Sequence, residues 1–202
     1  MNRLDFAALI ASRLCHDLAS PVSAMANGAE LIADEPDPAE RAELSRLICA
    51  STAVLVARLR CYRLLFAGGQ DLPVPLTEAK TTLGDFLSGN GHVTLDWASA
   101  TVPSTRTMAR LLMALAITAA EAIEGDGTIR IGSEADGWRV TANGPLVRLS
   151  SEHRVAIEAH SHADPRPRVA IAILAAALAE SIEVAITLAE TTTSLTFVIE
   201  HQ

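Results

Sequence analysis

Residues 12–21 have the sequence Ser12-Arg13-Leu14-Cys15-His16-Asp17-Leu18-Ala19-Ser20-Pro21, and the apolar residues around this stretch recur at steps of three and four. This spacing predicts one amphipathic helix from about Leu4 to Asp34. Its apolar stripe contains Ile10, Leu14, Leu18, Val22, Met25, Ala29 and Ile32. At about 100° per residue, His16 lies roughly 200° from Leu14 and roughly 160° from Leu18. We therefore expect His16 to point into solvent, with the carboxylate of Asp17 beside it.

A second helix is predicted after a short turn at residues 34–38. Asp37 is a suitable N-cap, Pro38 suits the first helical position, and Glu40 is placed to complete a capping box. We expect Pro21 to bend the first helix and Gly68-Gly69 to end the second. Two long helices joined by a short turn form an antiparallel hairpin. Because one hairpin cannot cover two apolar faces, we expect residues 1–69 to form a four-helix bundle as a homodimer.

The pattern becomes mixed after Leu72-Pro73-Val74-Pro75, which suggests a second domain over residues 73–202. Helices and strands alternate there without a strict βαβ rhythm, so we predict an α+β domain with helices on one face of a sheet. The expected helices are Thr77–Leu87, Arg106–Glu124 closed by Gly125, a short one from Ser150 or Ser151, and Arg168–Glu180. The expected strands are His92–Ala98, Gly127–Ser133, Trp138–Ala142, Ile182–Leu188 and Ser194–Glu200.

The composition limits the classes of function. With 202 residues, half of them apolar, the chain can bury a substantial core. Its formal net charge of −8 argues against a nucleic-acid partner, since phosphate contacts need clustered Lys and Arg. The three cysteines lack metal-ligand spacing and indicate reduced thiols. The N-terminus lacks a signal-peptide pattern, and the longest uncharged apolar run, residues 169–179, is too short to span a bilayer. We therefore expect a soluble cytoplasmic protein with no membrane partner.

An exposed histidine, a following acid and a proline five residues on, in a dimerising hairpin, resemble the H-box of sensor histidine kinases. The chain more closely resembles the ChpT-type histidine phosphotransferases. The matching runs are Cys15-His16-Asp17-Leu18-Ala19-Ser20-Pro21-Val22, Asn27-Gly28-Ala29-Glu30-Leu31 and Tyr62-Arg63-Leu64-Leu65-Phe66-Ala67-Gly68. The resemblance covers the whole chain in layout and is specific mainly in these segments. It implies a dimeric hairpin domain for histidine phosphotransfer, followed by a degenerate, Bergerat-type ATPase-like α/β sandwich.

Three departures from the kinase pattern concern the nucleotide site. A kinase needs asparagines on one helix for Mg²⁺, an Asp-x-Gly turn for adenine and a Gly-rich loop for phosphates. Ala114 and Thr118 stand where the asparagines are expected, and Ala142 stands at the adenine-reading aspartate. Pro165-Arg166-Pro167-Arg168 replaces the Gly-rich loop. We therefore expect no ATP-dependent kinase activity and no cofactor on this chain, with Mg²⁺ supplied by a partner receiver domain.

The resemblance implies that Nε2 of His16 accepts a phosphoryl group from a receiver aspartate and passes it to another receiver. An imidazole titrates near neutral pH and offers a nucleophilic nitrogen there. Asp17 is the candidate acceptor of the Nδ1 proton, and Ser20, one turn on, is a candidate phosphoryl contact. The alternative for Asp17 and Ser20 is that they are ordinary exposed polar residues. The expected partners are response-regulator receiver domains and a hybrid histidine kinase.

Small residues off the apolar stripe form a candidate groove for a partner's helix. The groove residues are Ala24, Asn27, Gly28, Ala53, Val56, Ala57 and Arg60. The alternative for them is close helix packing inside the dimer. Two other functions stay open as well: an active ATP-dependent histidine kinase, and a non-catalytic module that docks receiver domains. A metal site at His153, His160, His162 and Asp164 is disfavoured, because their spacing matches no common ligand set.

Overall fold

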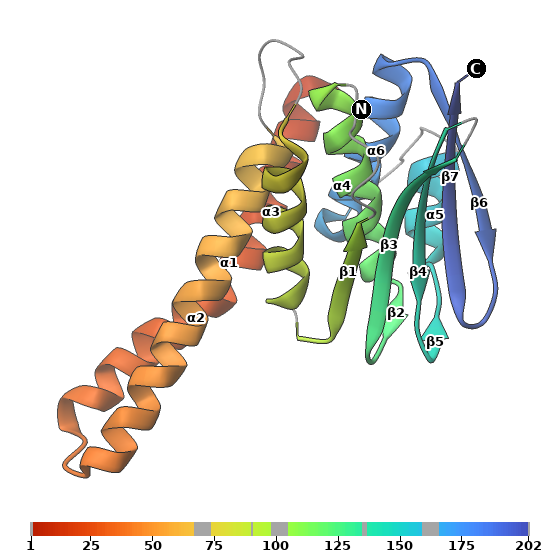
Figure 1. Ribbon diagram of the computed structural model, residues 1–202. Coiled ribbons are helices and arrows are strands. Elements are labelled where there is room, and N and C mark those ends of the chain that lie inside the picture. Colours follow the sequence, from red (N-terminus) through yellow and green to blue (C-terminus); the bar gives the residue numbers. More distant parts are fainter. Residues whose placement is uncertain are drawn as a thin grey trace.

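A computed structural model describes residues 2–66, 74–89, 91–97, 105–134, 137–158 and 166–201, and it has the form of a helical arm attached to an α+β domain (Figure 1). The arm consists of α1 (Arg3–Asp34) and α2 (Pro38–Leu65), which run antiparallel. The turn between them projects away from the rest of the molecule, and their other ends pack against it. The predicted hairpin is confirmed within this chain.

The ends of the two helices follow from their capping residues. The Asn2 side chain accepts a hydrogen bond from the Asp5 N–H and the Asp5 carboxylate accepts one from the Asn2 N–H, which forms a capping box on α1. Asp37 caps α2, with Pro38 as the first helical residue, as predicted. The predicted reciprocal bond from Glu40 is wrong, because Glu35 Oε1 occupies the Asp37 N–H at 2.9 Å.

Helix α1 continues through Pro21, whose ring is buried, and α2 ends at Leu65. The predicted stop at Gly68-Gly69 lies outside the described residues.

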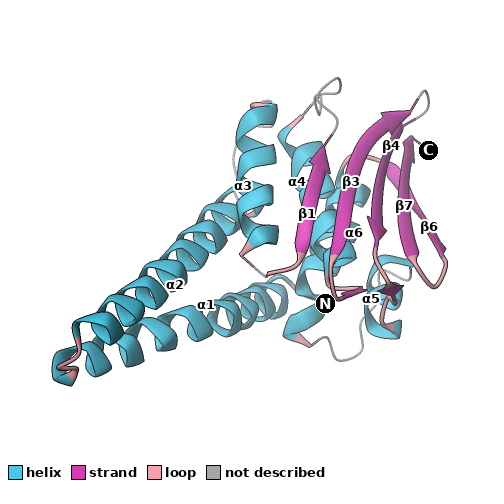
Figure 2. Ribbon diagram, turned by 60° about the horizontal axis from the view of Figure 1, so that its bottom comes forward, coloured by secondary structure: helices cyan, strands magenta, loops and turns pink. Residues whose placement is uncertain are grey.

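The second region forms a five-stranded sheet in the order β1-β3-β4-β7-β6. The β1–β3 pair is parallel, and the other neighbours are antiparallel. Its strands are β1 (Val93–Trp97), β3 (Gly127–Glu134), β4 (Gly137–Asn143), β6 (Val184–Glu190) and β7 (Ser194–His201). Its helices are α3 (Leu76–Ser88), α4 (Arg106–Ala120), α5 (Ser151–Glu158), the 3₁₀ turn η1 (Pro167–Val169) and α6 (Ala170–Ser181). Figure 2 shows these helices gathered on one side of the sheet, which confirms the predicted α+β layering.

The predicted helix over 106–124 is too long. Helix α4 ends at Ala120, and Ile123–Glu124 form the short strand β2. This strand pairs with β5 (Leu146–Val147), which lies more than twenty residues further along the chain. Gly125, with φ of 85°, follows a strand rather than closing a helix. The strand pairing is a non-local interaction, so the helical period of the preceding residues does not indicate it.

One hydrophobic core joins the arm to the second domain. Leu9 of α1 and Cys61, Tyr62 and Leu65 of α2 belong to the same buried cluster as the residues of α4, α6 and the sheet. Burial raises the pKa of the Cys61 thiol to about 12, so this cysteine is an inert core residue. Arg110 of α4 donates to the Leu65 carbonyl at 2.6 Å. The base of the hairpin is therefore held by the second domain.

None of the helices that the structure describes combines the length and apolarity that a bilayer-spanning helix requires.

Gly28 permits close contact between α1 and α2, and its replacement should weaken the hairpin. A Cβ atom at this position would lie 2.8 Å from Ile48 Cγ1. Gly28→Val is expected to lower the free energy of unfolding by about 1–3 kcal/mol, the usual cost of overpacking. Ala26→Val puts the same side chain on an exposed position of α1 and should cost about 0.5 kcal/mol. Urea unfolding followed by circular dichroism measures both, and a Gly28 variant at least as stable as the Ala26 variant would contradict the packing.

Candidate functional site

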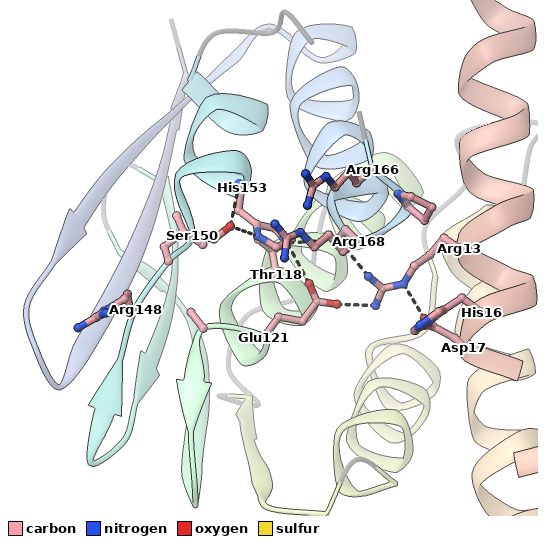
Figure 3. Close-up of a pocket in the computed structure, with 13 residues that line it drawn as sticks. Arg13, His16, Asp17, Thr118, Glu121, Arg148, Ser150, His153, Arg166 and Arg168 are labelled. Carbon is pink, nitrogen blue, oxygen red and sulfur yellow. Dashed lines mark hydrogen bonds and ion pairs between the residues drawn. The ribbon is translucent and has the colours of Figure 1, made fainter. Parts of the chain in front are cut away.

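His16 lies on the exposed face of α1, at the edge of a cavity between the arm and the second domain (Figure 3). Its side chain is 82% exposed, so the orientation predicted from the helical angle is confirmed. Its Nδ1 lies 3.1 Å from Asp17 Oδ1. When Asp17 is ionised it accepts a hydrogen bond from Nδ1–H, because a carboxylate offers only acceptors. Nε2 then carries the lone pair and faces away from the acid.

Asp17 is held by donors from both helices of the arm. Arg13 Nε lies 2.6 Å from its Oδ2, and the Tyr62 hydroxyl donates to the same oxygen. Arg58 donates to the backbone carbonyl of Asp17. Burial alone would raise the pKa of Asp17, but the bonds from Tyr62, Arg13 and His16 outweigh burial and lower it. Asp17 is therefore a carboxylate at neutral pH. Its Oδ2 accepts hydrogen bonds from Arg13 and Tyr62, and its Oδ1 faces His16.

The Arg13 guanidinium connects three elements. Besides its bond to Asp17, Nη2 lies 2.5 Å from Glu121 Oε1, just after α4, and Nη1 donates to the Arg168 carbonyl in η1 at 3.0 Å. Burial would lower the pKa of Arg13, but Glu121 and Asp17 outweigh it and raise it. Arg13 is thus a permanent cation that links the arm to the second domain.

His153 extends the same network into the second domain. Its Nε2 lies 3.1 Å from Glu121 Oε2 and 3.2 Å from the Arg168 carbonyl, two acceptors that together require a proton on Nε2. Its Nδ1 lies 2.7 Å from Ser150 Oγ. His153 is buried and structural, and the described residues contain no cluster of three or more metal-ligating side chains. His160, His162 and Asp164 lie outside the described residues.

The cavity beside His16 has a volume of about 540 Å³ and four arginines in its wall. It is lined by Arg13, His16, Asp17, Thr118, Glu121, Ala122, Arg148, Leu149, Ser150, His153, Arg166, Pro167 and Arg168. Arg168 forms a bidentate pair with Glu152, through Nε at 2.9 Å and Nη2 at 2.6 Å. Thr118 donates to the Ala114 carbonyl at 2.9 Å, so its hydroxyl proton is used within α4. Ala114 and Ala142 are fully buried in the core.

The other sequence-predicted residues are spread along the arm. Ser20, one turn after His16, is exposed. The candidate groove residues that are exposed are Ala24, Asn27, Ala53, Val56 and Arg60. Gly28 and Ala57 are buried, and Gly28 packs against Ile48 of α2. For these two positions the structure favours close packing of the helices over a surface open to a partner.

Sequence reasoning missed Arg13, Arg58 and Tyr62. Arg13 precedes Asp17 by four residues, a spacing that brings side chains together on a helix, so this pair could have been found. Tyr62 is the single tyrosine of the chain, and sequence reasoning gave it no role beyond its place in the matching run 62–68. Its contact with Asp17 joins residues 45 positions apart, and local patterns carry no signal for it.

Comparisons with known proteins agree on one family. Residues 76–194 match the family described as histidine phosphotransferase C-terminal domain. The chain is 29% identical over 171 residues to the protein phosphotransferase ChpT of Brucella abortus (strain 2308). The matched region covers 82% of this chain and 78% of that protein. A solved structure of a bacterial phosphotransferase has the same fold, with a TM-score of 0.83 at 22% identity over 99% of this chain and 98% of the other.

The buried contacts of Asp17 give a pH-dependent prediction. Its pKa in the folded state lies below the unfolded value of about 3.9, so its stabilisation is present above that pH and is lost as pH falls through the folded pKa. Asp17→Asn should lower the free energy of unfolding at neutral pH by about 1–3 kcal/mol, and the difference from wild type should shrink below about pH 4. Glu30→Gln, at an exposed acid of the same helix, is the control and should change stability by less than about 0.5 kcal/mol. A deficit that persists unchanged into acid would contradict this account.

Proposed function

The chain belongs to the histidine phosphotransferase family, and from this premise we propose that it carries a phosphoryl group on His16 between the aspartates of receiver domains in a bacterial phosphorelay. The observation that carries the proposal is the geometry of one pair. The His16 imidazole is exposed, and its Nδ1 faces the carboxylate of Asp17. This arrangement leaves Nε2 free to act as the nucleophile.

The transfer needs little from this chain beyond a positioned imidazole. The Nε2 lone pair forms an N–P bond while the P–O bond to the receiver's aspartate breaks, and that electron pair leaves on the aspartate carboxylate. The Nδ1 proton stays within the His16–Asp17 pair, so the positive charge on the phosphorylated ring is balanced by Asp17. In the second transfer a carboxylate of another receiver attacks phosphorus and the N–P bond breaks. Mg²⁺ bound by the receiver would supply the neutralisation of the phosphoryl oxygens.

Ser20 supports the same site in this proposal. It is exposed one turn after His16 on α1 and can donate a hydrogen bond to a phosphoryl oxygen held by a docked receiver. The exposed groove positions of α1 and α2 supply the adjoining surface for the receiver's helix. A hybrid histidine kinase supplies the first phosphorylated receiver, and the relay operates in the cytoplasm.

A second copy of the chain is the proposed partner of the arm. Large apolar side chains outside the groove stay exposed along the arm, among them Val22, Leu31, Leu47 and Leu59. Exposed apolar side chains collected on one element mark an association surface. Pairing two arms into a four-helix bundle would cover these side chains with the same surface of the other copy.

Transfer of label to wild type and variants tests the proposed nucleophile. Receiver domains that carry a radiolabelled phosphoryl group on their aspartate are mixed with each protein. The acid-labile, alkali-stable label that appears on the protein is then counted. His16→Gln should take no label, because the amide has no nucleophilic nitrogen of this kind. His92→Gln removes another exposed histidine, 69% exposed, and should label like wild type. Label on the His16 variant, or none on wild type from any receiver, would refute the proposal.

The oligomeric state tests the role of the arm. Leu59→Glu introduces a charge on the exposed apolar surface of the arm. A homodimer would bury this charge twice, once from each copy of the chain. Since burying a leucine contributes about 1.5–3 kcal/mol, the dimer dissociation constant should rise about a hundredfold or more. Val155→Glu, at a position of α5 with the same exposed fraction of 47%, should leave it unchanged. Analytical ultracentrifugation measures both, and a wild-type monomer at all concentrations would exclude the bundle.

A further inference from the structure

The carboxylate of Asp17 is fixed at one oxygen and presents the other to His16. Arg13 Nε and the Tyr62 hydroxyl both donate to Oδ2, whereas Oδ1 faces His16 Nδ1. Two donors on a single oxygen determine the plane of the carboxylate, so they also determine where Oδ1 lies. Rotation of Asp17 about its side-chain bonds would break both contacts and leave a half-buried charge without compensation, which is costly.

The second domain holds the Tyr62 donor in place. The Tyr62 side chain is only 3% exposed, and its ring packs edge-on against Phe86 of α3, with centroids 5.7 Å apart. The ring of Phe66 stacks on it from the end of α2, also at 5.7 Å. Burial and the nearby Asp17 carboxylate raise the pKa of Tyr62, so its hydroxyl stays protonated and acts only as a donor towards Asp17.

The second domain also holds the Arg13 donor. Glu121 accepts from Arg13 at one carboxylate oxygen and from His153 Nε2 at the other. Figure 3 shows the resulting sequence of contacts from His153 through Glu121 and Arg13 to Asp17 and His16. The Arg168 carbonyl receives bonds from both Arg13 and His153, which closes the network around η1. Both donors to Asp17 Oδ2 are therefore fixed by residues beyond the arm.

We infer that Arg13 and Tyr62 are positioning residues for phosphotransfer, and that the second domain takes part in the reaction by holding them. This inference rests on the proposed role of His16. In a neutral imidazole either ring nitrogen can carry the proton. A fixed Asp17 Oδ1 selects the form with the proton on Nδ1, which is the form whose Nε2 can attack phosphorus. Loss of either donor allows Asp17 to move and reduces the population of that form.

Tyr62→Phe tests the inference with little effect on packing, since only the hydroxyl is lost. In protein labelled with ¹⁵N at histidine and held above pH 8, the ring-nitrogen chemical shifts of His16 report the proton's position. The variant should show a larger population with the proton on Nε2. Its phosphotransfer rate should fall about tenfold, and in an Asp17→Ala background the same substitution should cause no further loss. Thr52→Val removes a hydroxyl that bonds to the Ile48 carbonyl elsewhere on α2 and should leave both measurements unchanged.

Glu121→Ala tests the contribution of the second domain through Arg13. It should lower the rate and shift the tautomer in the same direction as Tyr62→Phe, and Glu121→Gln, which keeps an acceptor oxygen for Arg13, should restore part of both. Equal slowing by Tyr62→Phe with and without Asp17 would overturn the inference, as would an unchanged tautomer in both single variants. The tautomer is read without any receiver, so it decides the positioning role even if wild type accepts no label and the proposed function fails.

Discussion

A carboxylate placed at the junction of two domains is the constraint on which the rest of this structure depends. Asp17 is half-buried, and a charge in that position must be compensated by donors or it destabilises the fold. The compensation comes from an arginine one turn earlier and a tyrosine on the neighbouring helix. Because both act on Oδ2, the acid is satisfied without using the oxygen that faces His16. Oδ2 of Asp17 thus accepts the bonds that stabilise the buried charge, while Oδ1 faces the imidazole of His16.

Charge alternates along the contacts that lead from the second domain to the imidazole. Glu121 lies between His153 and Arg13, and Arg13 lies between Glu121 and Asp17. Glu121, Arg13 and Asp17 each have a partner on both sides, so none of these three charges is left uncompensated in the low-dielectric junction. Removing one member would leave two others with incomplete partners. Such networks respond to substitution as a unit, which is why coupled substitutions measure them better than single ones.

The sequence predicted what local spacing determines. The exposure of His16 followed from its angle on α1, and the start of α2 at Pro38 followed from the capping preference of Asp37. What depends on distant residues was missed: α4 ends at Ala120 because β2 pairs with β5. The Tyr62–Asp17 contact belongs to the same class. For Gly28 the sequence left a partner groove and close helix packing both open, and its contact with Ile48 favours packing. A helical period describes one helix at a time, so it identified the exposed histidine and the acid beside it but not the groups that hold the acid.

The core that the arm shares with the second domain links the fold of that domain to the geometry around His16. Ala114 and Ala142 of the second domain are fully buried in this core. The same core contains Tyr62 and Leu65 of the arm. Unfolding the second domain would expose these residues, release the ring of Tyr62 from Phe86 and detach Arg13 from Glu121. Changes that unfold the domain would therefore remove the support of both donors to Asp17. The need to hold the His16–Asp17 pair in place is therefore a constraint on the fold of the second domain.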